Sequence, residues 1–375
     1  MIFLYGLYIL LGFYSLFLLF IFIGIFRIKN CKDSLFFNDI SVIVAAHNEE
    51  KDIANLLDFL SFQEYPKDKY EVIIINDRSR DNTEGIIKKY SEKYNNIKYL
   101  KIDKEDKNLV GKKNALTKGI EQSNGNILLF TDADCVPGKN WLKSINNQFN
   151  LGFDVVVGYS PLVSYNTKTI FQKFVFLLKR LERLSIFSIS AGTIGWNWGV
   201  TATGRNFAYR KRVFKELNGF SGIGHIPSGD DDLFLQKISK SKKYKISFAK
   251  DKKSFVNSVE RKSAKEQINQ EKRRASKWIY YPLNIKIYLA LIFVFYLFLF
   301  ISFVMAIFSS FSWNSFLGIF IVKVIFDFLI VIKGAILFRE NRLLWIFPLA
   351  EIFYIPYFLI FGILGTFTRY RWHDK

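Results

Sequence analysis

The sequence predicts an α/β domain built on a mostly parallel β-sheet, with membrane-spanning helices at both ends of the chain. Strand-like and helix-like stretches alternate between residues 40 and 130, the pattern of parallel strands joined by right-handed crossovers. Apolar runs of membrane length lie outside this region. We therefore expect an N-terminal helix over 1–27, a cytoplasmic domain over 38–280, and about three hydrophobic helices over 285–368.

The chain has 53 Lys and Arg against 33 Asp and Glu, a formal charge of +20. Such an excess indicates an anionic partner: nucleic acid, phosphorylated substrates or a membrane surface. Because the basic residues cluster beside apolar runs, we favour membrane lipid and expect no nucleic acid. Cys31 and Cys135 show neither zinc-site nor redox spacing, which excludes a disulfide framework and indicates a reducing compartment.

Residues 2–26 carry no charged side chain. As a helix they would extend roughly 37 Å, enough to cross a hydrocarbon core of about 30 Å. A cleaved signal peptide is the alternative, but its basic start and small-residue cleavage site are both missing. Arg27, Lys29 and Lys32 follow directly, which predicts that this end of the helix faces the cytoplasm.

Polar residues follow three of the predicted strands. The strands are expected over 40–46, 70–75, 97–102, 126–130 and 153–159, with helices ending at Leu60, running from Thr83 to about Tyr94 and opening at Gly111. Since ligands bind at the carboxyl edge of open α/β sheets, we expect Asn48 and Glu49, Asp77, and Asp132 with Asp134 to converge on a nucleotide site. A usual dinucleotide fold is excluded because no G-x-G-x-x-G follows the first strand.

Two of these segments could meet a metal and a diphosphate. Asp132 and Asp134 end a buried strand and could hold a hard divalent cation; a polar strand end without a ligand is the alternative. Gly111 and Lys112 open a helix, where backbone N–H groups and a cation could face phosphates. The segment is not a P-loop, and a solvated lysine pair is the alternative.

Four motifs occur in the order and spacing of a family 2 glycosyltransferase: Ala45-Ala46-His47-Asn48-Glu49-Glu50, Ile75-Asn76-Asp77-Arg78-Ser79, Gly111-Lys112-Lys113-Asn114-Ala115-Leu116 and Thr131-Asp132-Ala133-Asp134. Over roughly residues 38–280 the chain resembles membrane-anchored members of this family, in the cellulose and hyaluronan synthase-like superfamily. The resemblance implies a Rossmann-like GT-A fold that binds a nucleotide-diphosphate sugar with Mg²⁺ or Mn²⁺.

The resemblance also implies roles for single residues. The nucleoside would be contacted by Ala46, His47, Asn48, Glu49 and Asp77. Lys112 would lie near the phosphates and Asp132 near the nucleotide sugar, while Asp134, with Asp132 as a second candidate, would ligate the metal. Asn76 stands where the family often has Asp, and His47 where it often has Tyr, so the nucleotide contacts should differ in detail.

Three carboxylates are adjacent in the sequence, at Asp230, Asp231 and Asp232. Their charges repel one another, so such a cluster is unfavourable unless it serves a function. A crowded carboxylate has a raised proton affinity, which suits a general base; a helix cap or an acidic surface loop is the alternative. By resemblance, Asp231 would be the catalytic base, with Asp230 beside it on the acceptor side. The third Asp leaves an ambiguity of one residue.

The acceptor is expected to meet later segments. Residues 171–189 predict a helix near the membrane surface or a buried helix of the catalytic domain, and 192–204 a loop whose Trp196 and Trp198 either stack on a sugar or pack. In the family, the segment of Arg205 and Asn206 leads from the donor towards the acceptor. Arg274, Lys277 and Trp278 resemble the acceptor-holding (Gln/Arg)-x-x-Arg-Trp element, with Lys in place of Arg; a basic interfacial flank is the alternative.

The C-terminal region contains three apolar candidates. Residues 287–308 predict a span, and 316–337 a second in which Lys323 and Asp327 could pair. Residues 343–367 are interrupted by two prolines and Glu351. A full third span would put the basic tail outside, so this segment is interfacial or re-entrant, or the tail breaks the positive-inside rule.

These patterns predict a multi-pass integral membrane enzyme, expected in a bacterial inner membrane with a cytoplasmic catalytic domain. It would be an inverting glycosyltransferase that moves a sugar to a lipid-linked or glycan acceptor. A processive polysaccharide synthase is the alternative within the class, although about three C-terminal spans are few for a channel. An inactive membrane scaffold is the alternative from another class, and the acidic residues described above argue against it.

Overall fold

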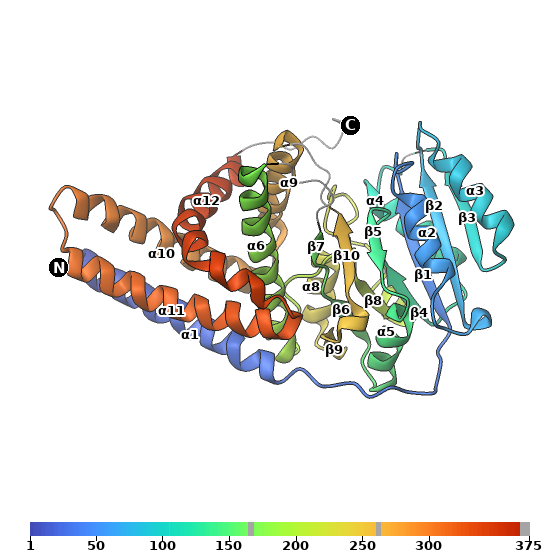
Figure 1. Cartoon of the computed structure of the whole chain (residues 1–375), viewed down its shortest axis with the longest axis horizontal. Helices are drawn as coiled ribbons and strands as arrows, with labels where there is room; N and C mark the ends of the chain where they lie inside the picture. Colours follow the sequence, from blue (N-terminus) through green and yellow to red (C-terminus); the bar gives the residue numbers. More distant parts are fainter. Residues whose placement is uncertain (105, 164–168, 260–263, 368–375) are drawn as a thin grey trace. The chain divides into compact units, whose positions relative to one another are not determined.

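The computed structural model describes residues 1–104, 106–163, 169–259 and 264–367 (Figure 1). They form two compact units. The sheet unit comprises Ile28–Tyr165 and Ile194–Glu260, and the helical unit comprises Met1–Arg27, Asn166–Thr193 and Arg261–Lys375. The functional limits predicted from the sequence, including 38–280 for the catalytic domain, stay a prediction, because compactness alone does not define them.

The sheet unit is built on seven strands in the order β3-β2-β1-β4-β8-β6-β9. Their bounds are β1 (Ile40–Ala46), β2 (Tyr70–Asp77), β3 (Ile97–Ile102), β4 (Ile127–Phe130), β6 (Val155–Gly158), β8 (Phe207–Arg210) and β9 (Ile246–Ala249). All neighbours pair in parallel except β8, which is antiparallel to both β4 and β6. The predicted α/β fold with a mostly parallel sheet is confirmed. A smaller sheet pairs β5 (Cys135–Pro137), β10 (Val256–Val259) and β7 (Leu162–Val163).

Helices cover both faces of the central strands. Val42 and Val44 of β1 belong to a core shared with α2 (Ile53–Ser61), α3 (Thr83–Lys93) and α5 (Trp141–Asn150). On the other face, Gly119 of α4 (Lys112–Gln122) lies against Ile43 and Ile75. Since both faces are buried, these strands read as nearly continuous apolar runs in the sequence. The remaining elements of this unit are α7 (Lys211–Glu216), α8 (Asp232–Ser241), η1 (Lys67–Lys69) and η2 (Lys252–Ser254).

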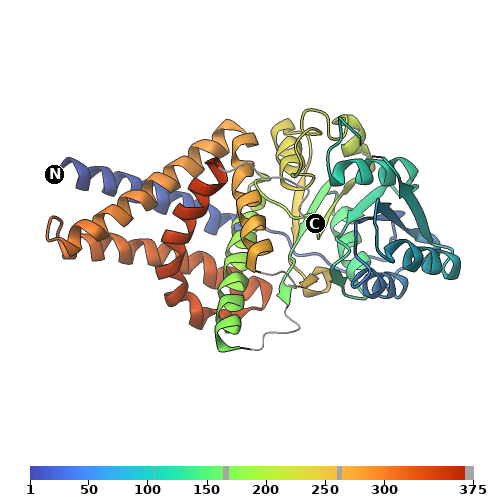
Figure 2. The same ribbon diagram turned by 90° about the horizontal axis from the view of Figure 1, so that it is seen from above.

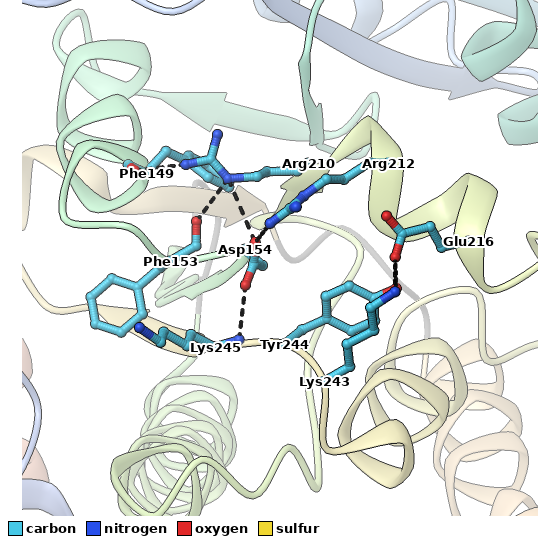
Figure 3. A network of polar contacts seen from close by, with 9 residues as sticks. All are labelled: Phe149, Phe153, Asp154, Arg210, Arg212, Glu216, Lys243, Tyr244 and Lys245. Atoms are coloured by element: carbon cyan, nitrogen blue, oxygen red, sulfur yellow. Dashed lines mark hydrogen bonds and ion pairs between the residues drawn. The ribbon is translucent and has the colours of Figure 1, made fainter.

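A polar network ties together the adjoining ends of β6, β8 and β9 (Figure 3). Asp154 accepts hydrogen bonds from the guanidinium of Arg212 at 2.5 Å and from the backbone N–H of Lys245 at 3.0 Å. Arg210 donates to the carbonyls of Phe149 and Phe153, at 2.8 and 3.2 Å. These contacts fix the antiparallel strand β8 between its neighbours, and so they also fix the segment that enters β8 from the opposite edge.

Three elements differ from the sequence-based expectation. Strand β2 runs on to Asp77, so this residue closes a strand instead of starting a loop. Strand β6 is shorter than predicted. Helix α6 (Ile170–Gly195) continues into the expected loop at 192–204, because Gly192 lies against Ile21 and Ser188 against Gly334 in the helical unit. These contacts contradict the alternative of a buried helix inside the catalytic domain.

Four segments of the helical unit are long and apolar enough to cross a membrane. They are α1 (Ile2–Phe26), α10 (Leu283–Ile307), α11 (Trp313–Phe338), and α12 (Phe347–Phe367) together with the preceding η4 (Asn341–Ile346). Figures 1 and 2 show α1, α10 and α11 side by side, with α12, α6 and α9 (Ala264–Ser276) gathered at one end of them. The short η3 (Lys277–Tyr280) joins α9 to α10.

A buried polar cluster links the four apolar helices. Lys323 of α11 lies 2.7 Å from Asp327 and forms a second ion pair with Glu351 of α12. Tyr14 of α1 donates to Asp327, and its hydroxyl is 2.9 Å from that of Tyr296 in α10. The predicted pairing of Lys323 with Asp327 is confirmed, and the lysine side chain is fully buried.

Helix α6 contacts the segment before α12 and the middle of α12, where the hydroxyl of Tyr357 donates to Glu182 at 3.3 Å. Arg180 forms an ion pair with Glu340, which directly precedes η4. Two residues further along α6, Glu182 pairs with Arg274 of α9. The segment following Arg274 packs on the far end of α12, where Trp278 Nε1 donates to Thr366 at 3.0 Å.

Candidate active site

The direction of β8 explains how distant residues meet at the carboxyl edge of β4. Because β8 is antiparallel, its first residue, Phe207, pairs with Phe130, the last residue of β4. The residues just before β8 therefore emerge beside those just after β4. Accordingly, Nε of Arg205 lies 3.5 Å from Oδ2 of Asp132.

The loops after β1 and β2 interlock. Nδ1 of His47 is 2.5 Å from the carbonyl oxygen of Asp77, and the backbone N–H of Asn48 donates to Ser79 at 3.0 Å. Asn48 and Arg78 adopt positive φ angles of 56° and 59°. A left-handed Arg costs about 1–2 kcal/mol, and such strain concentrates at functional sites. These neighbouring strand ends thus form one rigid corner.

The structure brings together the residues that we expected to contact the nucleoside. Ala46 ends β1 and is fully buried, backbone included, so the structure gives no sign that it touches a ligand directly. The backbone N–H of Glu49 donates to Thr83 at 2.8 Å. The carboxylate of Asp77 is paired with Nε of Arg78 at 2.8 Å and is mostly buried. The nucleobase of a donor that faces Asp77 would therefore meet a carboxylate whose position is already fixed by Arg78.

Asp132 lies between two cations. Lys112, at the start of α4, forms an ion pair with one carboxylate oxygen, and Arg205 approaches the other. Burial alone would raise the pKa of Asp132, but Lys112 and Arg205 outweigh it, so the pKa is lowered. Burial alone would lower the pKa of Lys112, but Asp132 and Asp230 outweigh it and raise that pKa. Both groups therefore remain charged at neutral pH.

Asp134 is the carboxylate of the pair that is left for a metal. It forms no ion pair with any residue of the described ranges, whereas Asp132 has two cationic neighbours. Asp132, Asp134 and Cys135 offer ligand atoms within 4.8 Å of one another. Burial raises the pKa of the Cys135 thiol, so it stays protonated, and the oxygen ligands suit Mg²⁺ or Mn²⁺. The donor set fits a divalent cation held chiefly by Asp134.

The guanidinium of Arg205 gives a second sign of a ligand. Its Nε is buried and has no hydrogen-bond partner in the described part of the chain. An unpaired buried donor is costly, and an anion bound beside Asp134 would satisfy it. This group therefore fits a phosphate better than a neutral acceptor.

The three adjacent carboxylates have different environments. Asp231 caps α8, with Oδ1 accepting from the backbone N–H of Asp232 at 2.7 Å and Oδ2 from that of Gly204 at 3.0 Å. Asp232 is buried and accepts from the backbone N–H of Leu233 at 2.9 Å. The pKa of Asp230 is raised by burial and by Asp231, against the opposing effect of Lys112.

An opening above Gly204 is surrounded by charged groups. A Cβ atom placed on Gly204 would lie 3.4 Å from Oδ2 of Asp230, 3.7 Å from Nζ of Lys112 and 3.8 Å from Oδ1 of Asp132. These are ordinary van der Waals distances, so the missing side chain leaves room for a single methyl group among the three, and the opening above Gly204 denotes this position. The carboxylate next to this opening is Asp230, while that of Asp231 is bound to the backbone.

Some residues expected to touch the acceptor are engaged elsewhere. Asn206 is 1% exposed, and its amide accepts from Trp141 at 3.0 Å and donates to two backbone carbonyls. This geometry does not support acceptor contact. Arg274 belongs to the helical unit, where Glu182 and Glu271 hold its guanidinium. Lys277 and Trp278 lie in the same unit.

Lys113 is the residue that sequence reasoning missed. The alternative of a solvated lysine pair does not hold for it, because Lys113 is 1% exposed and its Nζ donates to the carbonyls of Ile226 and Ser228. The signal lies in helix geometry, because successive helical residues point about 100° apart. If Lys112 faces the site, Lys113 turns towards the interior.

Residues 41–217 match the model of the family described as glycosyl transferase family 2. The matched range holds Asp77, Lys112, Asp132 and Asp134, and it ends before Asp230.

Several known proteins resemble the chain over part of its length. The probable glycosyltransferase YdaM of Bacillus subtilis is 34% identical over 187 residues, which are 48% of this chain and 42% of that protein. The beta-monoglucosyldiacylglycerol synthase of Nostoc sp. is 38% identical over 95 residues, 25% of this chain and 20% of that protein. The chain thus spans less than half the length of these two relatives.

A solved structure shows the same fold over the whole chain. The mannosyltransferase PcManGT from Pyrobaculum calidifontis, determined in complex with GDP-Man and Mn²⁺, covers 100% of both chains with a TM-score of 0.54 and 17% identity. At this identity the likeness establishes the fold alone, which is GT-A.

Proposed function

Because the chain belongs to glycosyltransferase family 2, we propose that it transfers a sugar from a nucleotide-diphosphate sugar to a membrane-associated acceptor. The observation that carries the proposal is the opening above Gly204, where Asp230, Lys112 and Asp132 face one another. A transferred sugar needs a cation beside its leaving diphosphate and a carboxylate beside the attacking hydroxyl, and Lys112 and Asp230 bring both close together next to Gly204.

The donor would bind along the carboxyl edge of the sheet. Residues 46–49 and Asp77 would hold the nucleoside, while Lys112 and Nε of Arg205, which has no hydrogen-bond partner among the described residues, would meet the diphosphate. Asp134, with Asp132 as the neighbouring carboxylate, would hold Mg²⁺ or Mn²⁺. When bound, the cation supplies charge neutralisation to the leaving diphosphate. Lys112 and Arg205 would stabilise the same developing charge through hydrogen bonds.

The geometry favours Asp230 as the base, one residue before the Asp231 expected from the sequence. Hydrogen bonds from backbone N–H groups stabilise the charged form of a carboxylate and make it a weaker base. Both oxygens of Asp231 accept such bonds, from Gly204 and Asp232. Asp230 has the raised pKa and borders the opening. It would take the proton of an acceptor hydroxyl whose oxygen attacks the anomeric carbon opposite the diphosphate, which inverts the configuration.

The acceptor would be lipid-linked or otherwise held at the membrane. Four helices are apolar enough to span a bilayer, and the Nostoc relative is by its name a synthase of a glucosylated diacylglycerol. The charged helix α9, with Arg274, leads through Lys277 and Trp278 into α10. An Arg and a Trp at such a flank could meet phosphate and sugar groups at the cytoplasmic surface of a multi-pass, bacterial inner-membrane protein.

The test uses the full chain in lipid nanodiscs and a panel of UDP- and GDP-linked sugars, with release of nucleoside diphosphate as the readout. We expect release with Mn²⁺ or Mg²⁺ for at least one donor, and its loss in the Asp134→Asn variant. Added glycolipid should gain one or two sugars; a long polymer would instead identify a processive synthase. If folded protein neither binds nor cleaves any donor of the panel, the proposal is wrong.

A further inference from the structure

The buried ammonium group of Lys113 connects α4 to the loop that carries the proposed base. Its Nζ donates to the carbonyl of Ile226 at 2.5 Å and to that of Ser228 at 2.8 Å. An ammonium group taken out of water is strongly unfavourable unless it is paired or hydrogen-bonded. These two contacts therefore matter for the lysine and for the loop alike. Asp230 follows Ser228 by two residues.

The start of the loop is held from α8, where Nζ of Lys237 donates to the carbonyl of Ser221 at 2.7 Å. Its later part contains Gly229, whose positive φ angle of 89° lies in a region that favours glycine. The backbone N–H of Val110 donates to the carbonyl of Gly224 at 2.9 Å, just ahead of α4. A glycine-rich segment has large conformational freedom, so the bonds from residues 110–113 help to fix the part of the loop that leads to Asp230.

The same turn of α4 faces the donor side. Lys112 forms an ion pair with Asp132, and its neighbour Lys113 points inward to the loop. One helix start therefore touches the proposed diphosphate site and the segment before the proposed base. A shift of this helix would move both.

We propose that Lys113 is a positioning residue for sugar transfer, which holds residues 226–230 so that the carboxylate of Asp230 borders the opening above Gly204. This inference rests on the proposed function. Lys113 touches neither donor nor acceptor; it acts through the two carbonyls and through its charge. A misplacement of about 1 Å at a reacting group can cost about 10²-fold in rate, which sets the size of the effect.

The charge of Lys113 also acts on Asp230. Lys112 and Lys113 of α4 lower the pKa of Asp230, while its burial, Asp231 of α8 and Asp132 after β4 raise it. Tyr209 of β8 also lies within electrostatic reach of this carboxylate. Removal of the Lys113 charge should therefore move the acidic limb of the rate profile to higher pH. A lysine that merely fills the core would not produce this change.

The experiment compares Lys113→Met with Lys112→Met in the full chain in nanodiscs. Amide hydrogen exchange of residues 220–229 reports the loop, binding of UDP and GDP with Mn²⁺ reports the diphosphate site, and kcat with its pH dependence reports transfer. For Lys113→Met we expect loop exchange faster by about tenfold or more, nearly unchanged diphosphate affinity, and kcat lower by about 10²-fold. For Lys112→Met we expect weaker diphosphate binding with unchanged loop exchange. Lys113→Arg, which keeps the charge and the donors, should restore most of kcat.

Equal behaviour of the two methionine variants, or unchanged loop exchange in Lys113→Met, would overturn the inference. Should Lys113→Met not fold, Lys113→Gln is measured in its place with the same expectations. The exchange measurement needs no turnover. If the loop loosens as expected but the unmodified protein transfers no sugar, the proposed function fails while the attachment of the loop by Lys113 stands.

Discussion

The backbone N–H of Gly204 donates a hydrogen bond of 3.0 Å to Oδ2 of Asp231. This bond joins the segment entering β8 to the start of α8, two elements about thirty residues apart in the chain. Asp231 therefore both caps α8 and anchors the segment that precedes β8. It also holds Gly204 in the place where the absence of a side chain leaves an opening.

Substitution of the adjacent carboxylates should separate chemistry from stability. Asp230→Asn removes the proposed base, and we expect kcat to fall by about 10²–10⁴-fold with little change in thermal stability. Asp231→Asn keeps acceptor oxygens for the two backbone N–H groups only in part. It should cost about 1 kcal/mol of stability and reduce kcat much less. Steady-state kinetics and thermal unfolding of both variants provide the measurement.

The opposite pattern, with kcat lost in Asp231→Asn and kept in Asp230→Asn, would identify Asp231 as the catalytic base. Asp103→Asn serves as a control, because its carboxylate is 72% exposed and forms only a surface ion pair, 3.5 Å from Lys101, among the described residues. It should match the unmodified protein in both measurements.

Metal binding should depend chiefly on Asp134. Asp134→Asn removes the carboxylate that forms no ion pair with the described residues, so we expect the Kd for Mn²⁺ in the presence of a nucleoside diphosphate to rise by about tenfold or more. Asp132→Asn should weaken Mn²⁺ less, because Lys112 and Arg205 already engage that carboxylate. Electron paramagnetic resonance of free Mn²⁺ measures both without turnover. A larger rise of the Kd for Mn²⁺ in Asp132→Asn than in Asp134→Asn would show that Asp132 is the main metal ligand.

Glu71 should make the stability of the sheet unit dependent on pH. Its carboxylate is 12% exposed and accepts from the backbone N–H of Asn124, from Lys98 and from Ser41. Burial alone would raise the pKa of Glu71, but these contacts outweigh it and the pKa is lowered. A lowered folded pKa means that the stabilisation is complete above the unfolded pKa of about 4.3 and is lost as the pH falls through the folded pKa.

We therefore expect Glu71→Gln to lower stability by about 1–3 kcal/mol at pH 7 and to approach the unmodified protein in acid. Thermal unfolding at a series of pH values provides the measurement. Glu64→Gln is the matched control, since Glu64 forms its 2.6 Å ion pair with Lys139 at an exposed site. A constant difference between Glu71→Gln and the parent at all pH values would contradict the assignment.

The buried cluster around Lys323 should be essential to the helical unit. Lys323→Met leaves the carboxylates of Asp327 and Glu351 without their shared cation, and loss of one partner from a buried ion pair costs about 3–5 kcal/mol. We expect a large fall in thermal stability in detergent. Lys333→Met is the control, because Lys333 contacts the ring of Phe26 and its loss should cost about 0.5–2 kcal/mol. Equal losses would show that the cluster contributes nothing special.

The edge of the sheet that holds the site could be predicted from the sequence, because polar residues interrupt apolar strands there. Asp77 and Asp132 come at the ends of β-branched or aliphatic runs whose length favours buried strands. The approach of Arg205 to Asp132 could be anticipated only by resemblance. The direction of β8 depends on its pairing with β4, and the four residues of β8 do not indicate whether that pairing is parallel or antiparallel.

The distinction between Asp230 and Asp231 was beyond sequence reasoning for a different reason. Two adjacent aspartates look the same in a sequence. The residue at which α8 begins decides which of them caps the helix, and the sequence does not fix that residue. No role was predicted for Lys113, because lysine is rarely buried and the sequence alone gives no sign that this one is. In both cases the local backbone, and not the residue type, determines the role.

The contacts of α6 with α12 and the segment before it bear on where the two ends of the chain lie. Arg180 pairs with Glu340, just ahead of η4, while Glu182 accepts a hydrogen bond from the hydroxyl of Tyr357 in the middle of α12. As a helix of 21 residues α12 is about 30 Å long, so it can cross a hydrocarbon core or lie along its surface. If α12 crosses together with α1, α10 and α11, the described helices make four crossings; if it stays on one side, they make three. With four crossings, protease-accessible tags at the two ends should be cleaved from the same face of sealed vesicles, and with three from opposite faces.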